Sequence, residues 1–140
     1  MAPWWSPERH AAKRARLAAR HKIGAAVRAY FEREGFLETA CGALAASPGN
    51  ETHLHAVKAS VNDLGGTAHN LYLHTSPEFA MKKLLAAGEP KIFELARVFR
   101  GREGGALNVT EFTMLEWYRA NEPYARVIED TISLIHIAAA

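Results

Sequence analysis

The stretch from Lys91 to Arg119, KIFELARVFRGREGGALNVTEFTMLEWYR, decides the fold. Its first part, Ile92 to Phe99, is rich in β-branched and aromatic residues, and its last part, Glu111 to Tyr118, alternates between two sets of side chains. Period-two alternation is typical of a β-strand with two different faces. The glycines between the two parts indicate a loop, so we expect two strands that run antiparallel to each other.

This predicted pairing gathers polar and aromatic side chains on one face. Phe112, Glu116 and Tyr118 share a face of their strand, and an antiparallel return brings Arg100 near them. An arginine offers a planar fork for phosphate or carboxylate, an aromatic ring stacks on a flat base, and a carboxylate holds an ammonium group. Two interpretations stay open here, namely a site for a polar ligand and a half-buried sheet with a structural Arg–Glu pair.

The composition limits the possible classes of protein. The 140 residues are 49% hydrophobic and 23% charged with a net charge of +2, which predicts one globular domain and excludes a polyelectrolyte. Cys41 is the only cysteine, so an intramolecular disulfide is impossible and a cytoplasmic location is expected. No apolar run reaches the roughly 20 residues of a membrane helix, so we expect no membrane partner.

A long helix is predicted from about Pro7 to Glu34. Ser6 suits the N-cap with Pro7 at the first helical position, and Gly35 suits the position just after the helix. The first half of this helix is basic, with Arg9, Lys13, Arg14, Arg16, Arg20 and Lys22. Two interpretations are possible: a solvated helix face, or a contact with an acidic protein or RNA.

A hairpin is predicted between this helix and the Lys91–Arg119 stretch, with strands at Thr52–Val61 and Asn70–His74. His53 and His55 would then share one face of the first strand. Two histidines at this spacing suit a metal, but the sequence offers no third ligand nearby, so we predict no metal site.

A helix entry is predicted at Thr75-Ser76-Pro77-Glu78, where a hydroxyl and a proline precede the apolar run FAMKKLLAAG. The helix should end before Gly88. Glu78 then has two possible roles, either as a carboxylate that complements the helix dipole or as a ligand-binding group at the lip of the sheet. A last helix is expected to begin at Pro123.

Three of these segments together resemble a known family, namely Thr75-Ser76-Pro77-Glu78, Phe99-Arg100 and the run from Glu111 to Arg119. They are similar to the catalytic core of class II aminoacyl-tRNA synthetases of the lysyl type. More closely, they resemble the stand-alone lysyl-tRNA synthetase-like ligases that attach lysine or β-lysine to a lysine of translation elongation factor P. The resemblance implies an α+β fold, with part of a class II synthetase-type antiparallel sheet flanked by helices.

The resemblance also implies a role for each matching residue. Arg100 matches the catalytic arginine that holds the α-phosphate of ATP and the carboxylate of the amino acid, and Phe112 matches the ring that stacks on adenine. Glu78 matches the carboxylate near the substrate's α-amino group. Glu116 and Tyr118 match residues around the lysine ε-ammonium group. ATP and Mg²⁺ are the implied cofactors, with lysine or β-lysine and elongation factor P as substrates.

The sequence departs from the family's pattern in several places. The family dimerises through its first motif, so the resemblance implies a homodimer. Gly42 stands where that motif has a proline at the dimer interface, which weakens this expectation. The usual Arg-x-Glu is Arg100-Gly101-Arg102-Glu103 here, so Glu103 replaces the expected carboxylate one place later. Asn108 occupies the loop position that usually holds a histidine, and we include Glu103 and Asn108 among the predicted ATP-binding residues.

The third motif of the family, which carries a second ATP-binding arginine, has no counterpart in these residues. We therefore expect residues 1–16 to be an arm and the start of the basic helix, and residues 17–140 to be the N-terminal part of a catalytic core. On this basis the chain is expected to be incomplete and to have little activity alone. Two alternatives stay open: part of a lysyl-tRNA synthetase core, with tRNA as a less favoured partner, and an inactive binding or dimerisation module.

Overall fold

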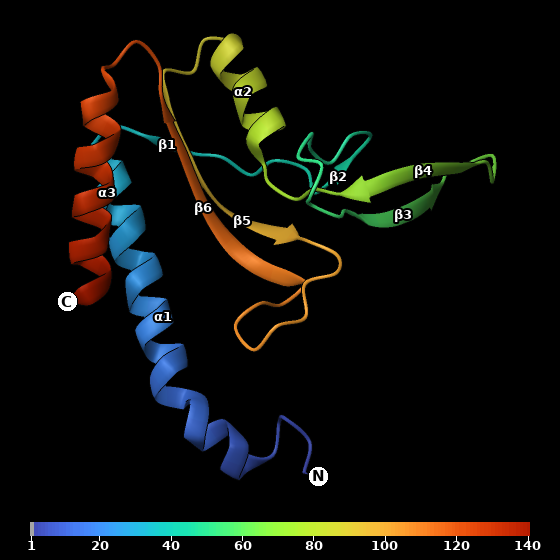
Figure 1. Ribbon diagram of the computed structural model, residues 1–140. Coiled ribbons are helices and arrows are strands. Elements are labelled where there is room, and N and C mark those ends of the chain that lie inside the picture. Colours follow the sequence, from blue (N-terminus) through green and yellow to red (C-terminus); the bar gives the residue numbers. More distant parts are fainter. Residues whose placement is uncertain (1) are drawn as a thin grey trace. The chain divides into compact units, whose positions relative to one another are not determined.

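The computed structural model describes residues 2–140, which form two compact units (Figure 1). One unit contains the N-terminal segment up to Phe36 together with Glu122–Ala140, and the other contains Leu37–Asn121. Met1, the first residue of the predicted arm, lies outside the described residues. No helix within residues 2–140 has both the length and the apolar character that crossing a membrane requires.

The first unit is helical and consists of α1 (Pro7–Arg33) and α3 (Tyr124–Ala139). The N-cap prediction is confirmed, because Ser6 Oγ accepts a hydrogen bond of 3.4 Å from the backbone N of Arg9. The α1 helix continues past residue 16, so the predicted boundary between the arm and the core falls inside it.

The core of the helical unit is aromatic. The Phe31 ring is fully buried and packs edge-on against Tyr30 at 5.3 Å and Phe36 at 4.8 Å between ring centroids. The hydroxyl of Tyr30 donates a hydrogen bond of 2.7 Å to Oδ1 of the buried Asp130 on α3. Burial, and then this hydrogen bond, raise the pKa of Tyr30, so the phenol remains a donor.

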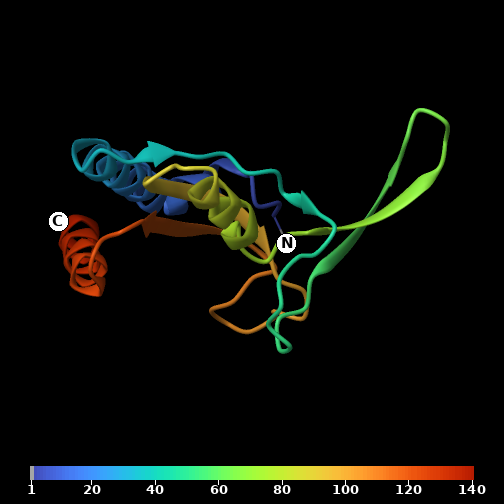
Figure 2. The same ribbon diagram turned by 90° about the horizontal axis from the view of Figure 1, so that it is seen from above.

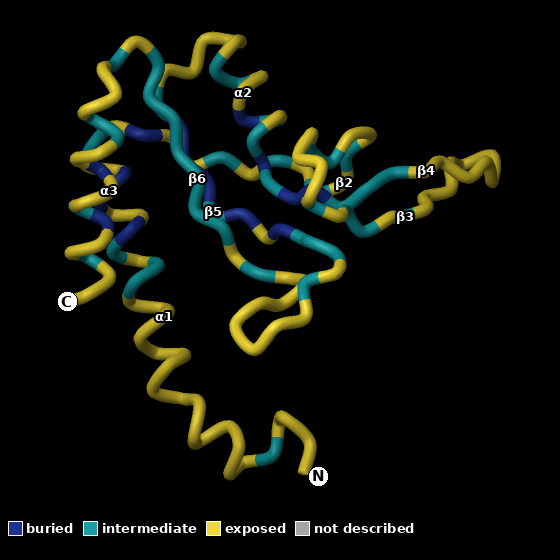
Figure 3. The backbone as a smooth tube through the Cα atoms, in the orientation of Figure 1, coloured by how far each residue is buried: buried dark blue, intermediate teal, exposed yellow. Residues whose placement is uncertain are grey.

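The second unit contains two three-stranded sheets. In the first, β5 (Lys91–Phe99) pairs antiparallel with β6 (Glu111–Arg119) and parallel with the short β1 (Leu37–Glu38). The predicted strand pair is therefore confirmed. Figure 3 shows that β5 contains most of the buried positions of this unit, and its buried apolar residues are Ile92, Phe93, Ala96 and Val98.

Helix α2 (Glu78–Ala86) lies alongside β5 and buries Met81 completely (Figures 1 and 2). It occupies the position predicted from Thr75-Ser76-Pro77-Glu78, and Gly88 follows its end with a φ of +113°, which favours glycine. The α+β class and the antiparallel strand pair with a helix beside it are thus as expected.

The second sheet consists of β2 (Leu44–Ala45), β4 (Ala68–Leu73) and β3 (Val57–Asn62) in that order, all antiparallel. Figure 2 shows the β3–β4 hairpin extending away from the rest of its unit. The predicted strand from Thr52 to Val61 was wrong in its first half, because the chain turns at Thr52 and His53, where Leu54 N donates to Glu51 O at 3.1 Å. His53 and His55 therefore do not share a strand face.

Candidate active site

The register of β5 and β6 places the predicted site residues on one face. Val98 lies opposite Phe112, and Glu94 lies opposite Glu116, so the side chains of these pairs point to the same side of the sheet. Beyond the last strand pair, Arg100 continues the antiparallel pairing, because its backbone N donates to Thr110 O at 2.8 Å.

Arg100 is positioned by two contacts. Its guanidinium carbon lies 5.4 Å from the centre of the Phe112 ring, which is within cation–π range, and its Nε donates a hydrogen bond of 3.3 Å to Thr75 O. Within residues 2–140, Arg100 forms no ion pair with Glu116. The structural Arg–Glu pair of the alternative interpretation does exist on this strand pair, but it joins Arg97 to Glu111 on the opposite face.

A cavity of about 270 Å³ opens beside Arg100 and Phe112. It is lined by Arg100, Glu103, Leu107, Asn108, Val109 and Phe112. The amide of Asn108 donates a hydrogen bond of 3.1 Å to Glu103 Oε2, so these two loop side chains act as one polar group. The structure thus brings together all four residues predicted for ATP, with a ring, a cation and a polar group around one space.

The turn after Arg100 explains why Glu103, and not residue 102, lines this cavity. Arg102 has a φ of +61°, in the left-handed region that non-glycine residues seldom occupy. Its guanidinium Nη1 lies 3.5 Å from His55 Nε2, outside the cavity. The left-handed backbone at Arg102 therefore directs the side chain of Arg102 away from the cavity and that of Glu103 into it.

Two of the three residues predicted to bind the amino acid, Glu116 and Tyr118, form a second group on the same face, and the third, Glu78, is linked to it through its backbone at the start of α2. The hydroxyl of Tyr118 donates to Glu116 Oε1, and Ser76 Oγ donates to Glu116 Oε2 at 2.7 Å. Ser76 Oγ in turn accepts from the backbone N of Glu78 at 3.0 Å, which links helix α2 to β6. Sequence reasoning did not select Ser76 as a site residue, although its hydroxyl at the helix entry was visible.

Two pKa shifts describe the electrostatics of this group. Burial, and then the hydrogen bond to Glu116, raise the pKa of Tyr118, so its phenol stays protonated and can donate. Glu78 Oε1 lies 2.5 Å from Lys82 Nζ, and the hydrogen bond from Glu78 raises the pKa of that ammonium group. The side chain of Glu78 thus already accepts a hydrogen bond from one ammonium group.

Consecutive residues join the two groups. The carbonyl of Thr75 accepts from Arg100, and the hydroxyl of Ser76 donates to Glu116. Thr75 is itself held, because its Oγ1 donates to Pro48 O at 2.9 Å and only 2% of the residue is exposed. The short segment before α2 therefore fixes the position of Arg100 relative to that of Glu116.

Glu94 was missed by the sequence analysis. It is 5% exposed, it lies directly opposite Glu116, and its Oε2 accepts from Thr39 Oγ1 at 2.9 Å and from Cys41 N at 3.1 Å. The available signal was a single acid within the apolar run IFELARVF. Burial, and then Glu94, raise the pKa of the Cys41 thiol to about 11.

Comparison with known proteins identifies the family of the chain. The sequence profile of the tRNA synthetases class II (D, K and N) matches residues 5–139, so the chain belongs to this family of class II synthetases. The family was therefore predicted correctly from the three motifs around Glu78, Arg100 and Glu116.

Among curated proteins, the chain is similar to those named elongation factor P–(R)-β-lysine ligase. It is 41% identical to the protein of Haemophilus ducreyi over 120 residues, which cover 85% of this chain and 37% of the relative. It is 39% identical to the protein of Erwinia tasmaniensis over 132 residues, covering 94% and 40%. The Pasteurella multocida protein is 39% identical over 120 residues, covering 85% and 37%. The chain thus spans about two fifths of the length of these relatives.

Proposed function

We propose that the chain contributes the nucleotide and amino-acid sites of an ATP-dependent ligase that activates lysine or β-lysine and transfers it to a lysine of elongation factor P. One observation carries the proposal: Arg100, Phe112, Glu103 and Asn108 line a single cavity, on the face that also holds Glu116. The similarity to elongation factor P–(R)-β-lysine ligases supports the acceptor and the amino acid.

The proposed reaction has two steps. A carboxylate oxygen of the amino acid attacks the α-phosphorus of ATP, an acyl–phosphate bond forms, and pyrophosphate leaves with the electron pair of the broken bond. The acceptor amine then attacks the acyl carbon, loses a proton, and AMP leaves. Both reactants of the first step are anions, so holding them in line and offsetting their charge provides most of the catalysis.

Each residue has a part in this proposal. Arg100 stays protonated and offers a fork that bridges the α-phosphate and the amino-acid carboxylate. Phe112 provides the flat surface for adenine, next to the polar pair Glu103 and Asn108. Glu116 retains acceptor capacity for an ammonium group, because a carboxylate has about four acceptor positions and two hydroxyl groups occupy two of them.

A Mg²⁺ ion held mainly by the nucleotide fits these donors. Within residues 2–140 no group of three or more His, Cys, Asp and Glu is arranged to hold a metal. Glu103 is the single carboxylate that lines the cavity. Mg²⁺ commonly keeps several waters and binds through one or two carboxylates plus phosphates, so Glu103 is the protein ligand we propose. The ion would offset the phosphate charge.

A cytoplasmic location and a homodimer belong to the same proposal. The location follows because ATP and a translation factor are the reactants, and the dimer follows because the family resemblance implies one.

The test measures binding and chemistry separately. Calorimetry with the full chain should detect binding of ATP, and lysine or (R)-β-lysine should bind when ATP is present. ATP–pyrophosphate exchange that requires the amino acid would establish activation by this chain. Arg97→Ala, on the opposite face of β5, is the matched control for Arg100→Ala. An absence of ATP binding at millimolar nucleotide, or equal losses in the two arginine variants, would contradict the proposal.

The second candidate, a lysyl-tRNA synthetase, rests on the family profile, which includes the lysine enzymes. It differs from the first in the acceptor only. The two candidates are separated by incubating the chain, ATP and labelled amino acid with elongation factor P and, in parallel, with tRNA. The first candidate predicts label on the protein and not on the tRNA.

A further inference from the structure

A second and larger cavity, of about 620 Å³, lies on the other side of the turn that follows Arg100. Its walls come from the segment before β3, from the β3–β4 sheet and from the turn itself. The polar residues that line it are Ser47, His55, Lys58, Tyr72, and Arg102. Its volume is within the range of ligand pockets, and the proposed function makes no use of it.

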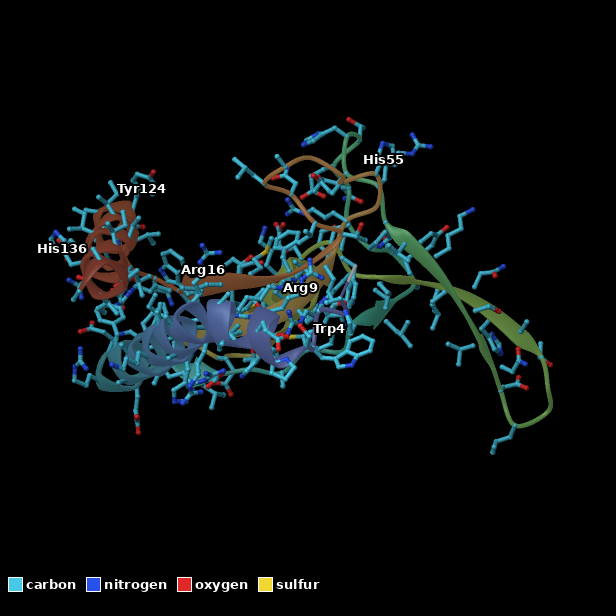
Figure 4. All side chains as sticks on the ribbon, turned by 90° about the horizontal axis from the view of Figure 1, so that it is seen from below. Trp4, Arg9, Arg16, His55, Tyr124 and His136 are labelled. Carbon is cyan, nitrogen blue, oxygen red and sulfur yellow. The ribbon has the colours of Figure 1, made fainter. Side chains whose placement is uncertain are left out.

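The fold brings the two sides of this cavity together. The register of the second sheet pairs Lys58 directly with Tyr72, so their side chains lie on one face. The turn is joined to the opposite wall by a bridge between His55 and Gly101, in which Gly101 N donates to His55 O at 2.5 Å. Figure 4 shows His55 beside the loop that joins β5 and β6.

Gly101 permits this close approach. A Cβ at this position would lie 3.1 Å from His55 O, so a larger residue would push the turn away from the wall. The next residue, Arg102, occupies the left-handed region at a φ of +61° although it is not a glycine. Such a conformation costs energy and persists where the surroundings require it. Its effect is to direct a guanidinium group to this cavity.

The charge of the lining is one-sided. Lys58 and Arg102 are cationic, His55 adds a ring nitrogen 3.5 Å from the Arg102 guanidinium, and no acidic residue lines the cavity. Within residues 2–140, neither Lys58 nor Arg102 forms an ion pair. Tyr72 and Ser47 add hydroxyl donors. A concave site with several donors and uncompensated positive charge attracts an oxyanion, and the arginine fork matches phosphate geometry.

We propose that this cavity, formed by His55, Lys58, Tyr72 and Arg102, is a second binding site for a free phosphate-class oxyanion, with pyrophosphate as the best-matched probe. Pyrophosphate has two phosphate groups for the two cations. The site differs from the cavity beside Phe112, from which Arg102 is turned away. The proposal therefore stands whether or not ATP binds there.

The experiment titrates pyrophosphate, and separately inorganic phosphate, into the full chain and follows backbone amide NMR signals and calorimetric heat. We expect saturable binding with shifts at Tyr72, Gly101 and Arg102, weaker at about 0.15 M salt than at low salt because exposed charges are screened. Arg102→Gly should weaken binding by about 10-fold or more, since it removes a charge-assisted contact. Lys58→Ala should weaken it as well, whereas Lys83→Ala, an exposed lysine on α2, should leave it unchanged.

The choice of glycine separates binding from folding. Glycine accepts the left-handed backbone, so Arg102→Gly should melt at the same temperature as the parent chain or higher. Arg100→Ala, which removes the cation of the other cavity, should weaken ATP binding and leave pyrophosphate binding intact. No pyrophosphate binding at low salt would overturn the proposal. So would binding that Arg100→Ala removes and Arg102→Gly leaves unchanged, or equal binding of a glutamate peptide of matched charge.

Discussion

The two faces of the β5–β6 pair contain the same charged residue types with different consequences. On one face, Arg97 Nε lies 3.3 Å from Glu111 Oε1, and the side chains are 51% and 57% exposed. On the other face, Arg100 contacts the Phe112 ring and a backbone carbonyl, and Glu116 accepts from two hydroxyl groups. The first arginine is neutralised by its own neighbour, whereas the second is not.

This difference teaches how a strand pair can have one structural face and one face whose charges are not paired with each other, which is the face we propose for binding. The register places Glu116 opposite Glu94, six residues along the chain from Arg100, so the two backbone positions are well separated. Their charged groups nevertheless contact consecutive residues, because Arg100 Nε donates to Thr75 O and Ser76 Oγ donates to Glu116. Neutral groups hold both charges, namely a ring and a carbonyl oxygen for the arginine and two hydroxyl groups for the glutamate. These charges stay available for a ligand that is anionic at one end and cationic at the other.

The largest expected effect comes from Arg100→Ala. Loss of the proposed charge-assisted contact to the α-phosphate should weaken ATP binding by about 10- to 100-fold, while Arg97→Ala should change it less than about 2-fold. Calorimetric titration of ATP into each variant measures this. Similar losses in both variants would show that general positive charge, and not the position over Phe112, determines the affinity.

Glu116→Gln should have the next largest effect. The amide keeps the size of the side chain and can still accept a hydrogen bond, but it removes the charge that an ammonium group requires, so lysine affinity should fall by about 10-fold. Glu111→Gln, on the same strand and the opposite face, is the matched control and should have no effect. Lysine titration in the presence of ATP gives both values, and norleucine serves as the uncharged ligand.

A smaller effect is expected at Glu94, behind the site. Glu94→Gln should lower the pKa of Cys41 from about 11, because it removes a nearby negative charge, although burial continues to raise it. More thiolate will then exist at pH 8, so alkylation of Cys41 by iodoacetamide should become several-fold faster. A rate that stays unchanged, with the melting temperature also unchanged, would show that burial alone controls this thiol.

Much of this face could be predicted because local rules determine it. The alternation from Glu111 to Tyr118 separates the two faces without knowledge of any partner, and Ser6 and Gly88 mark helix ends through backbone chemistry. Glu94 could not be found in this way, because its strand is buried and reads as one apolar run without alternation. Its role depends on Thr39 and Cys41, which only the tertiary fold brings near.

The predicted strand at Thr52–Val61 shows the opposite limit. Its alternating pattern was genuine, but the backbone turns at Thr52 and His53, and Gly101 pairs with His55 from a distant part of the chain. Sequence spacing between His53 and His55 therefore suggested a shared face that does not exist. The left-handed conformation of Arg102 could not be predicted from the sequence either. A positive φ is expected at a glycine, such as the adjacent Gly101, and not at an arginine.

The smallest expected effect tests the structural face directly. A double-mutant cycle of Arg97→Ala and Glu111→Ala should give a coupling free energy of about 0–1 kcal/mol, because both side chains are exposed and solvent screens their attraction. Chemical denaturation of the four proteins measures it, and raising the salt concentration should reduce it further. A coupling well above this range would mean that the pair is more than a solvated ion pair. Arg97→Ala would then disturb the strand that positions Arg100, and it would cease to be a neutral control for the binding face.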